Sequence, residues 1–134
     1  MHIASHMIVG RLVHDILAAG CSIKIVEPYG VKPVCPLTNS AQRVAANIEK
    51  YDEEHLHVFL PGNTSRRIER SDGYIRLIYA NGCGVINEHS PAVRHLARSA
   101  DMLAGALERL EDNSRRQPML ARLMIENPLD WGQS

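Results

Sequence analysis

A cysteine and a histidine stand close together in the segment YANGCGVINEHSPAV, residues 79 to 93. A nucleophilic pair needs a thiolate favoured by positive surroundings and a histidine within hydrogen-bond reach, and Cys83 with His89 supplies both residue types. The residues around Cys83 match no signature of a cysteine enzyme, and a lone cysteine is more commonly a small buried apolar residue. Cys83 and His89, with Glu88 beside them, are therefore the candidates of an enzymatic alternative.

The same segment has the composition of a tight turn that leads into a helix. Asn81 and Gly82 both tolerate positive φ, which tight turns require. Ser90 is a preferred N-cap residue, and Pro91 suits the first helical position, where its missing N–H costs nothing. Glu88 is placed to meet the positive end of the helix dipole. A turn and a helix start thus explain these residues without any chemistry.

Two histidines, His55 and His57, are spaced to lie on one face of a strand, with Glu53 and Glu54 just before them. Two imidazoles and a carboxylate can ligate a transition metal. No second histidine pair of a known metal-binding spacing accompanies them. We therefore expect outward-facing polar residues here, and neither a native metal nor another cofactor.

The segment 63 to 76 contains the best candidate site for an anion. Guanidinium groups bind phosphate through paired hydrogen bonds, and short polar residues at 63 to 65 add further donors. Glu69 and Asp72 are interleaved with the arginines, which favours an ordinary solvated surface. If the guanidinium groups converge, the ligand is an anion, either a nucleotide signal or a nucleic-acid backbone. The ligand-binding candidates are Arg66, Arg67, Arg70 and Arg76.

These side chains need a scaffold, and the spacing of apolar residues predicts one. The expected helices are 8 to 17, 38 to 51 and the long segment after Ser90; the expected strands are 21 to 27, 31 to 35, 55 to 60, 74 to 80 and 85 to 86. The acidic run 52 to 54 is expected to be a solvated turn. This order predicts an α+β fold, with a small, mainly antiparallel sheet and helices packed on one side.

The helix after Ser90 is expected to be long and amphipathic. Its apolar residues alternate at spacings of three and four, which is the pattern of a heptad seam. A helix packed on a sheet also needs an apolar stripe, but a strict seam is narrower than that packing requires. We therefore expect a homodimer, with residues 119 to 125 capping or swapping across the partner. The expected interface residues are Val93, Leu96, Ala100, Leu103, Leu107 and Leu110.

The chain of 134 residues is long enough for one domain with a proper core. Residues 1 to 6, MHIASH, look like an expression-vector remnant, so His2 and His6 are set aside. We expect a single α+β domain over residues 7 to 113 and a C-terminal helical arm over residues 114 to 134.

Composition bounds the compartment and the partners. The chain has 15 Lys and Arg against 15 Asp and Glu, which gives no strong field for nucleic acid. No helix-turn-helix with a basic second helix is recognisable, so a DNA-binding regulator is the weakest alternative. Three cysteines without a CxxC spacing argue against a disulfide framework. We expect a cytoplasmic protein with neither a membrane span nor a signal peptide.

The stretch GYIRLIYANGCGVINEHS, residues 73 to 90, resembles small uncharacterised proteins encoded by tailed phages of Gram-negative bacteria. Those proteins share a strand, Gly-Asn-Gly, Val-Ile, Asp-Tyr-Ser and a helix. Here Ala80 replaces the first glycine, and Glu88 and His89 replace Asp-Tyr. The resemblance extends loosely over residues 8 to 95 and transfers no catalytic residue. It implies a phage or prophage accessory gene that acts in the host cytoplasm.

We therefore expect a non-enzymatic phage accessory protein that binds and neutralises a host factor. The factor is a host defence protein or a phosphorylated nucleotide immune signal. The alternative is a small cytoplasmic enzyme that uses Cys83 and His89, or a metal held by His55 and His57.

Overall fold

The structure is a computed structural model that describes residues 3–28, 33–63, 70–79 and 85–114; the side chains of residues 3 and 111–114 are not described. The elements, in chain order, are α1 (Ile3–Ala18), β1 (Ser22–Val26), β2 (Cys35–Thr38), α2 (Ala41–Asn47), β3 (Glu53–Phe59), β4 (Gly73–Ile78), β5 (Ile86–His89), the 3-10 turn η1 (Pro91–Val93) and α3 (Arg94–Ser114).

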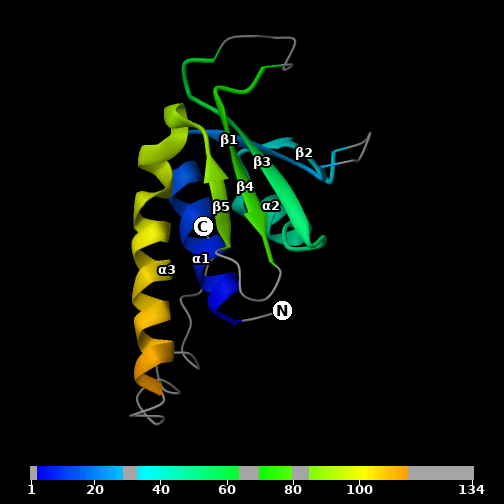
Figure 1. Ribbon diagram of the computed structural model, residues 1–134. Coiled ribbons are helices and arrows are strands. Elements are labelled where there is room, and N and C mark those ends of the chain that lie inside the picture. The colour runs from blue at the N-terminus through cyan, green and yellow to red at the C-terminus, as the bar shows by residue number, and fades with distance from the viewer. Residues whose placement is uncertain (1–2, 29–32, 64–69, 80–84, 115–134) are drawn as a thin grey trace.

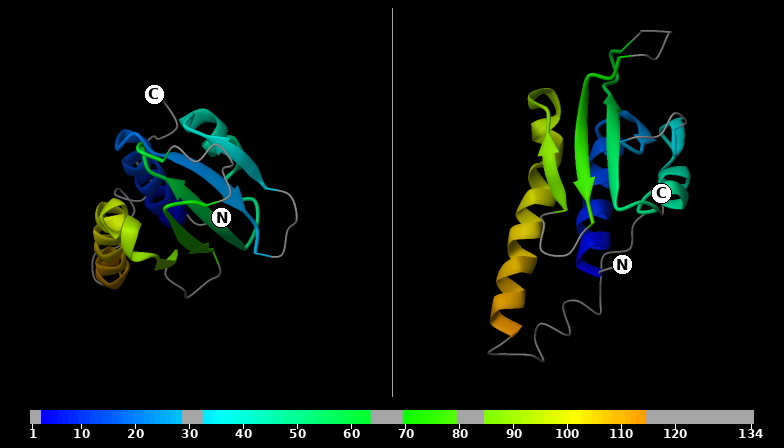
Figure 2. Two further views of the ribbon diagram at one scale, coloured as in Figure 1. Left: turned by 90° about the horizontal axis from the view of Figure 1, so that it is seen from above. Right: turned by 45° about the vertical axis from the view of Figure 1, so that its right-hand side comes forward.

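The strands form one five-stranded sheet in the order β2-β1-β3-β4-β5, and every neighbouring pair is antiparallel. Helices α1 and α3 lie side by side on one face of this sheet, and α2 lies on the same side, beyond β2 (Figures 1 and 2). The expected α+β fold, with helices on one side of an antiparallel sheet, is confirmed.

The core lies between the sheet and the helices α1 and α3. Alternation along the strands turns every second side chain toward the helices, and helical spacing gives α1 one apolar face. The fully buried members from the strands are Ile23, Ile25, Leu56, Val58, Ile75 and Leu77, and those from α1 are Val9, Leu12, Val13 and Ile16.

Helix α1 starts earlier than the sequence predicts. It begins at Ile3, within the segment 1 to 6 expected to be a vector remnant, and its Ala4 packs against the core while Ser5 is buried. Its end is as predicted, because Gly20 takes up a φ of +83° that few other residues adopt.

Helix α2 is shorter than predicted and ends at Asn47 rather than near residue 51. Of the polar residues before it, Ser40 is the N-cap, and its Oγ accepts a hydrogen bond from the Arg43 N–H at 3.3 Å. The acidic run that follows is not a solvated turn, because β3 begins at Glu53 and Glu54 is fully buried. The short edge strand β2 runs over Cys35–Thr38, later than the predicted 31 to 35.

Ser90 occupies the N-cap position of η1 and Pro91 its first turn, as predicted, but the Ser90 side chain makes no capping hydrogen bond. Its Oγ accepts a hydrogen bond from the Tyr74 N–H at 2.9 Å, so it ties the chain back to β4. Glu88 lies in β5 rather than at a helix start, and there it accepts a hydrogen bond from the Tyr74 hydroxyl at 2.8 Å. Ser90 and Glu88 therefore use their polar side chains to hold the end of β5 against Tyr74 of β4.

The apolar stripe of the last helix packs inside the chain. Val93, Leu96, Ala100 and Leu107 are buried within the monomer, and Leu103 and Leu110 pack partly buried against the same core. The four buried residues cannot contact a second copy without opening the core, which corrects their assignment to an interface. Residues 119 to 125, the expected swapping arm, lie outside the described residues.

Candidate binding site: the open face of the sheet

The face of the sheet turned away from the helices is mainly polar, and strand register also places Val26, Phe59 and Ile78 on it. In the described part of the chain no helix covers it (Figure 2), and we call it the open face. It carries Lys24 from β1; Glu53, His55 and His57 from β3; Tyr74 and Arg76 from β4; and Glu88 from β5.

Strand register brings these side chains into two rows across the sheet. Lys24 pairs with His57, which in turn pairs with Tyr74. In the next row His55 pairs with Arg76, which pairs with Glu88. Directly opposed residues in an antiparallel pair have Cβ atoms about 4.5–5.5 Å apart, so each row is a set of close neighbours.

Glu53 neutralises one end of the open face. Its carboxylate accepts a hydrogen bond from Arg76 Nη2 at 2.9 Å, and His55 Nε2 lies 3.3 Å from its other oxygen. The Arg76 hydrogen bond, more than any other contact, holds the pKa of Glu53 below its usual range. The Arg76 charge is therefore already matched by a carboxylate within the chain.

In the row that contains Lys24, unlike the row of Arg76, a histidine and a hydroxyl lie next to the positive charge. His57 Nδ1 lies 3.4 Å from the Ser71 hydroxyl, which comes from the segment just before β4. Burial lowers the pKa of His57, and the positive charges of Lys24 and His55 lower it further. His57 is therefore a neutral imidazole at pH 7 and can donate or accept a hydrogen bond.

A tyrosine links the open face to β5. The Tyr74 hydroxyl donates to Glu88 Oε1, and this hydrogen bond is the first cause of a raised Tyr74 pKa. Its ring lies 6.4 Å, centroid to centroid, from that of His55 and is tilted by 34° to it. Donors, acceptors and an aromatic ring thus lie together on one surface.

The arginines of the predicted anion site do not all fall where the structure can be described. Arg66 and Arg67 lie outside the described residues. Arg70 is exposed just before β4, whereas Arg76 is in the middle of β4 and paired with Glu53. Since a strand rises about 3.3 Å per residue, the two positions are on the order of 20 Å apart along the chain.

The predicted catalytic and metal residues are also placed only in part. Cys83 lies outside the described residues. His89 faces the helices, with Nε2 3.4 Å from Asp101 of α3. Its Nδ1 is buried without a hydrogen-bond partner among the described residues. His55 and His57 share the open face as expected, but the described residues contain no group of three or more His, Cys, Asp or Glu suited to a metal.

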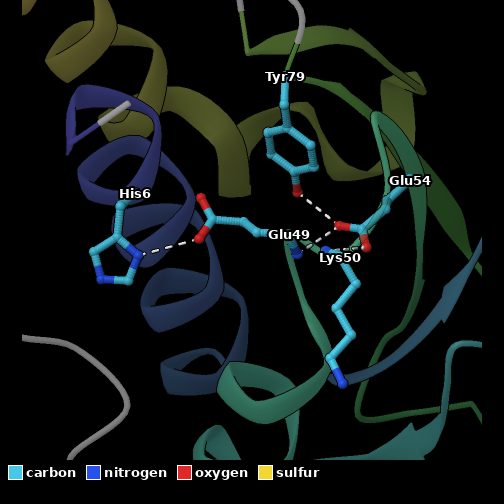
Figure 3. A network of polar contacts seen from close by, with 5 residues as sticks. All are labelled: His6, Glu49, Lys50, Glu54 and Tyr79. Carbon is cyan, nitrogen blue, oxygen red and sulfur yellow. Dashed lines mark hydrogen bonds and ion pairs between the residues drawn. The ribbon is translucent and has the colours of Figure 1, made fainter. Parts of the chain in front are cut away.

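Sequence reasoning missed a buried polar network at the start of β3 (Figure 3). The fully buried Glu54 accepts hydrogen bonds from the backbone N–H of Glu49 at 2.7 Å and of Lys50 at 3.0 Å, and from the Tyr79 hydroxyl at 2.8 Å. Glu49, at a φ of 63°, places its own carboxylate 3.1 Å from His6 of α1.

This network has a structural role that follows from its geometry. A buried carboxylate is tolerated when donors satisfy it, and Glu54 holds the α2–β3 turn through two consecutive N–H groups. Burial, with Glu54 as the second cause, raises the pKa of Tyr79, so its hydroxyl stays protonated and donating. The parity of β3 was the available signal, because Glu54 shares a face with Leu56 and Val58 once the strand starts at residue 53.

Comparisons with protein families, with curated proteins and with solved structures find no match to this chain. In the described residues, no helix is long and apolar enough to cross a membrane.

Proposed function

We propose that the protein acts by binding: it is a non-enzymatic accessory protein that takes up and neutralises a host factor. The observation that supports this proposal is the open face, a polar surface that spans β1, β3, β4 and β5 with no described helix over it. The stretch from 73 to 90, with its resemblance to phage-encoded proteins, supports a place in the cytoplasm of a Gram-negative host.

A protein is the kind of host factor that best suits this surface. The open face carries both signs of charge at separate positions, with Lys24 at one side and Glu88 at the other. Such a pattern favours a partner with complementary charges and sets its register more than its affinity. A phosphorylated nucleotide is the other candidate, and it would engage only the basic part.

Capture from a host lysate, with matched variants, tests the proposal. Lys24→Glu and His55→Glu reverse or add charge on the open face, and Arg43→Glu makes a similar change on an exposed site of α2. We expect the wild type and Arg43→Glu to retain the same host factor and the two open-face variants to lose it. Equal capture by all four proteins, or none by the wild type, would count against the proposal. Calorimetric titration with cyclic nucleotides tests the second candidate.

The reactivity of the thiols distinguishes the enzymatic alternative from the binding proposal. Cys21 and Cys35 are buried, and burial raises the pKa of both thiols, so neither reacts readily with iodoacetamide at neutral pH. Alkylation of the native protein, located by peptide mass spectrometry, therefore reports on Cys83. We expect the slow rate of an ordinary thiol and no bound metal in elemental analysis; a fast rate would favour the enzyme.

We propose a homodimer as the working assembly, through a surface other than the buried stripe. The outer side of α3 offers Met102, which is 69% exposed, beside a shallow hollow of about 190 Å³ lined also by Arg11, Ser99 and Leu103. Light scattering tests the assembly. Twice the chain mass of 14.9 kDa is expected, and the mass of a single chain would contradict it.

A further inference from the structure

The acidic side chains on and beside the open face already accept hydrogen bonds from other groups of the chain. Glu53 accepts from Arg76 and Glu88 accepts from Tyr74. At the end of the β3–β4 hairpin, Asp72 Oδ2 accepts from the Leu60 N–H at 2.7 Å and from the Asn63 amide at 3.0 Å. Each of these carboxylates therefore has donors from within the chain.

Lys24 is the exception among the charged groups of this surface. Within the described residues its ammonium group forms no ion pair with any of these carboxylates. Its direct cross-strand partner is His57, and the Ser71 hydroxyl lies 3.4 Å from the His57 ring. An ammonium, an imidazole and a hydroxyl are thus neighbours on an uncovered face.

We propose that Lys24, His57 and Ser71 form a binding site for an oxyanion, a phosphate or a carboxylate carried by the ligand. This inference rests on the proposed function and names the group of the host factor that the open face takes up. Lys24 supplies the charge. Neutral His57 and Ser71 share one hydrogen bond, so one donor is left for the anion, either the imidazole Nε2–H or the Ser71 hydroxyl, and protonation of His57 makes both available. Tyr74 stands on the far side of His57, where its hydroxyl is held by Glu88.

The electrostatics of His57 agree with this assignment. After burial, the Lys24 charge is the next cause that disfavours a proton on His57, and the same charge creates the positive potential that attracts an anion. A bound anion opposes this potential, so it raises the pKa of His57, and by linkage it binds more tightly as the pH falls.

The other charged or titratable groups that face this site are few. They are Glu53 and His55 from β3; Tyr74 and Arg76 from β4; Glu88 from β5; and Asp72, next to Ser71, whose carboxylate accepts hydrogen bonds from the Leu60 N–H and the Asn63 amide. Arg76 and Glu53 neutralise each other, and Glu88 is held by Tyr74. The pH dependence of anion binding is therefore expected to follow His57, with His55 as the neighbouring imidazole.

Nuclear magnetic resonance titration with inorganic phosphate tests the site. We expect saturable shifts confined to Lys24, His57, Ser71 and their neighbours, and a higher His57 pKa at saturating phosphate. Lys24→Gln and His57→Gln should each weaken the apparent Kd at least about fivefold. Arg43→Gln, which removes a positive charge from α2, should leave it unchanged. An unaltered amide spectrum in each variant shows that the fold is intact.

A second titration distinguishes the sources of the oxyanion. Adenosine diphosphate represents a nucleotide ligand, and a tetraglutamate peptide represents an acidic protein segment. Tighter binding of either one, lost in Lys24→Gln, supports the site and identifies the source. Shifts that stay linear to about 20 mM of all three probes, or that persist in Lys24→Gln, overturn it.

Failure of the site and failure of the proposed function give different results. If the open-face variants lose a captured host factor while no probe binds, the oxyanion site is wrong and the proposed function stands. If phosphate binds at Lys24 and no host factor is captured, the site stands and the proposed function is wrong.

Discussion

At the scale of single residues, Glu54 shows how a charged side chain comes to lie in this core. Its carboxylate receives three hydrogen bonds, two from the backbone of the preceding turn and one from Tyr79. Hydrogen bonds to a charged acceptor contribute about 1.5–3 kcal/mol each, and the loss of any of them leaves a buried group unsatisfied. Glu54 therefore fixes the turn at Glu49 and Lys50 and the end of β4 together.

Replacing Glu54 with glutamine tests this role. The amide keeps the shape but turns an NH₂ group toward donors, so we expect a loss of about 2–3 kcal/mol in the free energy of unfolding. Urea denaturation measures it. The control is Glu108→Gln at an exposed position of α3, which should change the value by no more than about 0.5 kcal/mol. Equal urea midpoints for the two variants would show that Glu54 is not an anchor.

The raised pKa of Tyr79 predicts alkaline instability. In the unfolded chain a tyrosine loses its proton near pH 10, whereas in the fold burial and Glu54 keep Tyr79 protonated. The unfolded state then binds fewer protons, so stability falls as the pH rises above about 10, by at most about 1.4 kcal/mol per pH unit. Tyr79→Phe should have a lower free energy of unfolding than the wild type at pH 7, but this free energy should fall less between pH 7 and pH 11. An equal fall in both proteins would contradict the raised pKa of Tyr79.

Residue roles were the hardest part to predict from the sequence. The arginines of 66 to 76 are close in sequence, but the described pair, Arg70 and Arg76, is separated along the hairpin, and Glu53 neutralises Arg76. Lys24 and His57 are far apart in sequence and become neighbours only through strand register. Spacing along the chain carries no information about a pairing between distant strands.

At the scale of elements, the joint between β4 and η1 depends on a missing side chain. A Cβ on Gly73 would lie 2.6 Å from Ser90 Oγ and 2.7 Å from a Val93 methyl group, much closer than real contacts allow. The close approach lets Ser90 accept the Tyr74 N–H and lets Val93 enter the core. The absence of a side chain at Gly73 therefore allows Ser90 and Val93, at the start of the last helical segment, to pack closely against β4.

Gly73→Ala should destabilise the protein by about 1–3 kcal/mol, because the added methyl group overpacks this joint. Gly62→Ala is the matched control: a Cβ there meets no atom within 4 Å, so stability should change little or rise slightly. Thermal unfolding of the two variants measures the difference. Equal melting temperatures for Gly73→Ala and Gly62→Ala would show that the contact between β4 and η1 has room for a methyl group.

The stripe on α3 makes a second element-scale prediction. Leu96 is 6% exposed and Met102 is 69% exposed. If the stripe is core, Leu96→Ala costs about 2–5 kcal/mol of folding stability and Met102→Ala no more than about 0.5 kcal/mol. Urea denaturation at two protein concentrations checks both values. An unchanged urea midpoint for Leu96→Ala would show that the stripe is not part of the core, and it would then be available as an interface.

The kinds of element were predictable, whereas several of their ends were not. Apolar periodicity indicated α1, α3 and the central strands, because each has one buried face. The end of α2 and the start of β3 were misplaced because Glu54 takes the N–H groups of Glu49 and Lys50, a tertiary contact that propensity does not reveal. The stripe of α3 was right as an apolar pattern, but four of its six residues pack within the chain, where α1 supplies a neighbouring helix (Figure 1).

At the scale of the whole molecule, the fold is divided into a helical side and an open side. Helices α1, α2 and α3 use the apolar face of the sheet for the core, and the polar face is left for other work (Figure 2). Most of its polar side chains are held in three separate hydrogen-bonded groups: His57 with Ser71, Tyr74 with Glu88, and Glu53 with Arg76 and His55. This division connects the sequence pattern of the strands to the proposed binding function.

The most direct test of the account is photo-crosslinking in host cells. Benzoylphenylalanine replaces His55 on the open face in one protein and Arg43 on α2 in another, and irradiation joins each to whatever lies against it. We expect a discrete covalent adduct with one host factor from position 55 and none from position 43. An adduct from position 43 alone, or from neither position, would contradict binding through the open face.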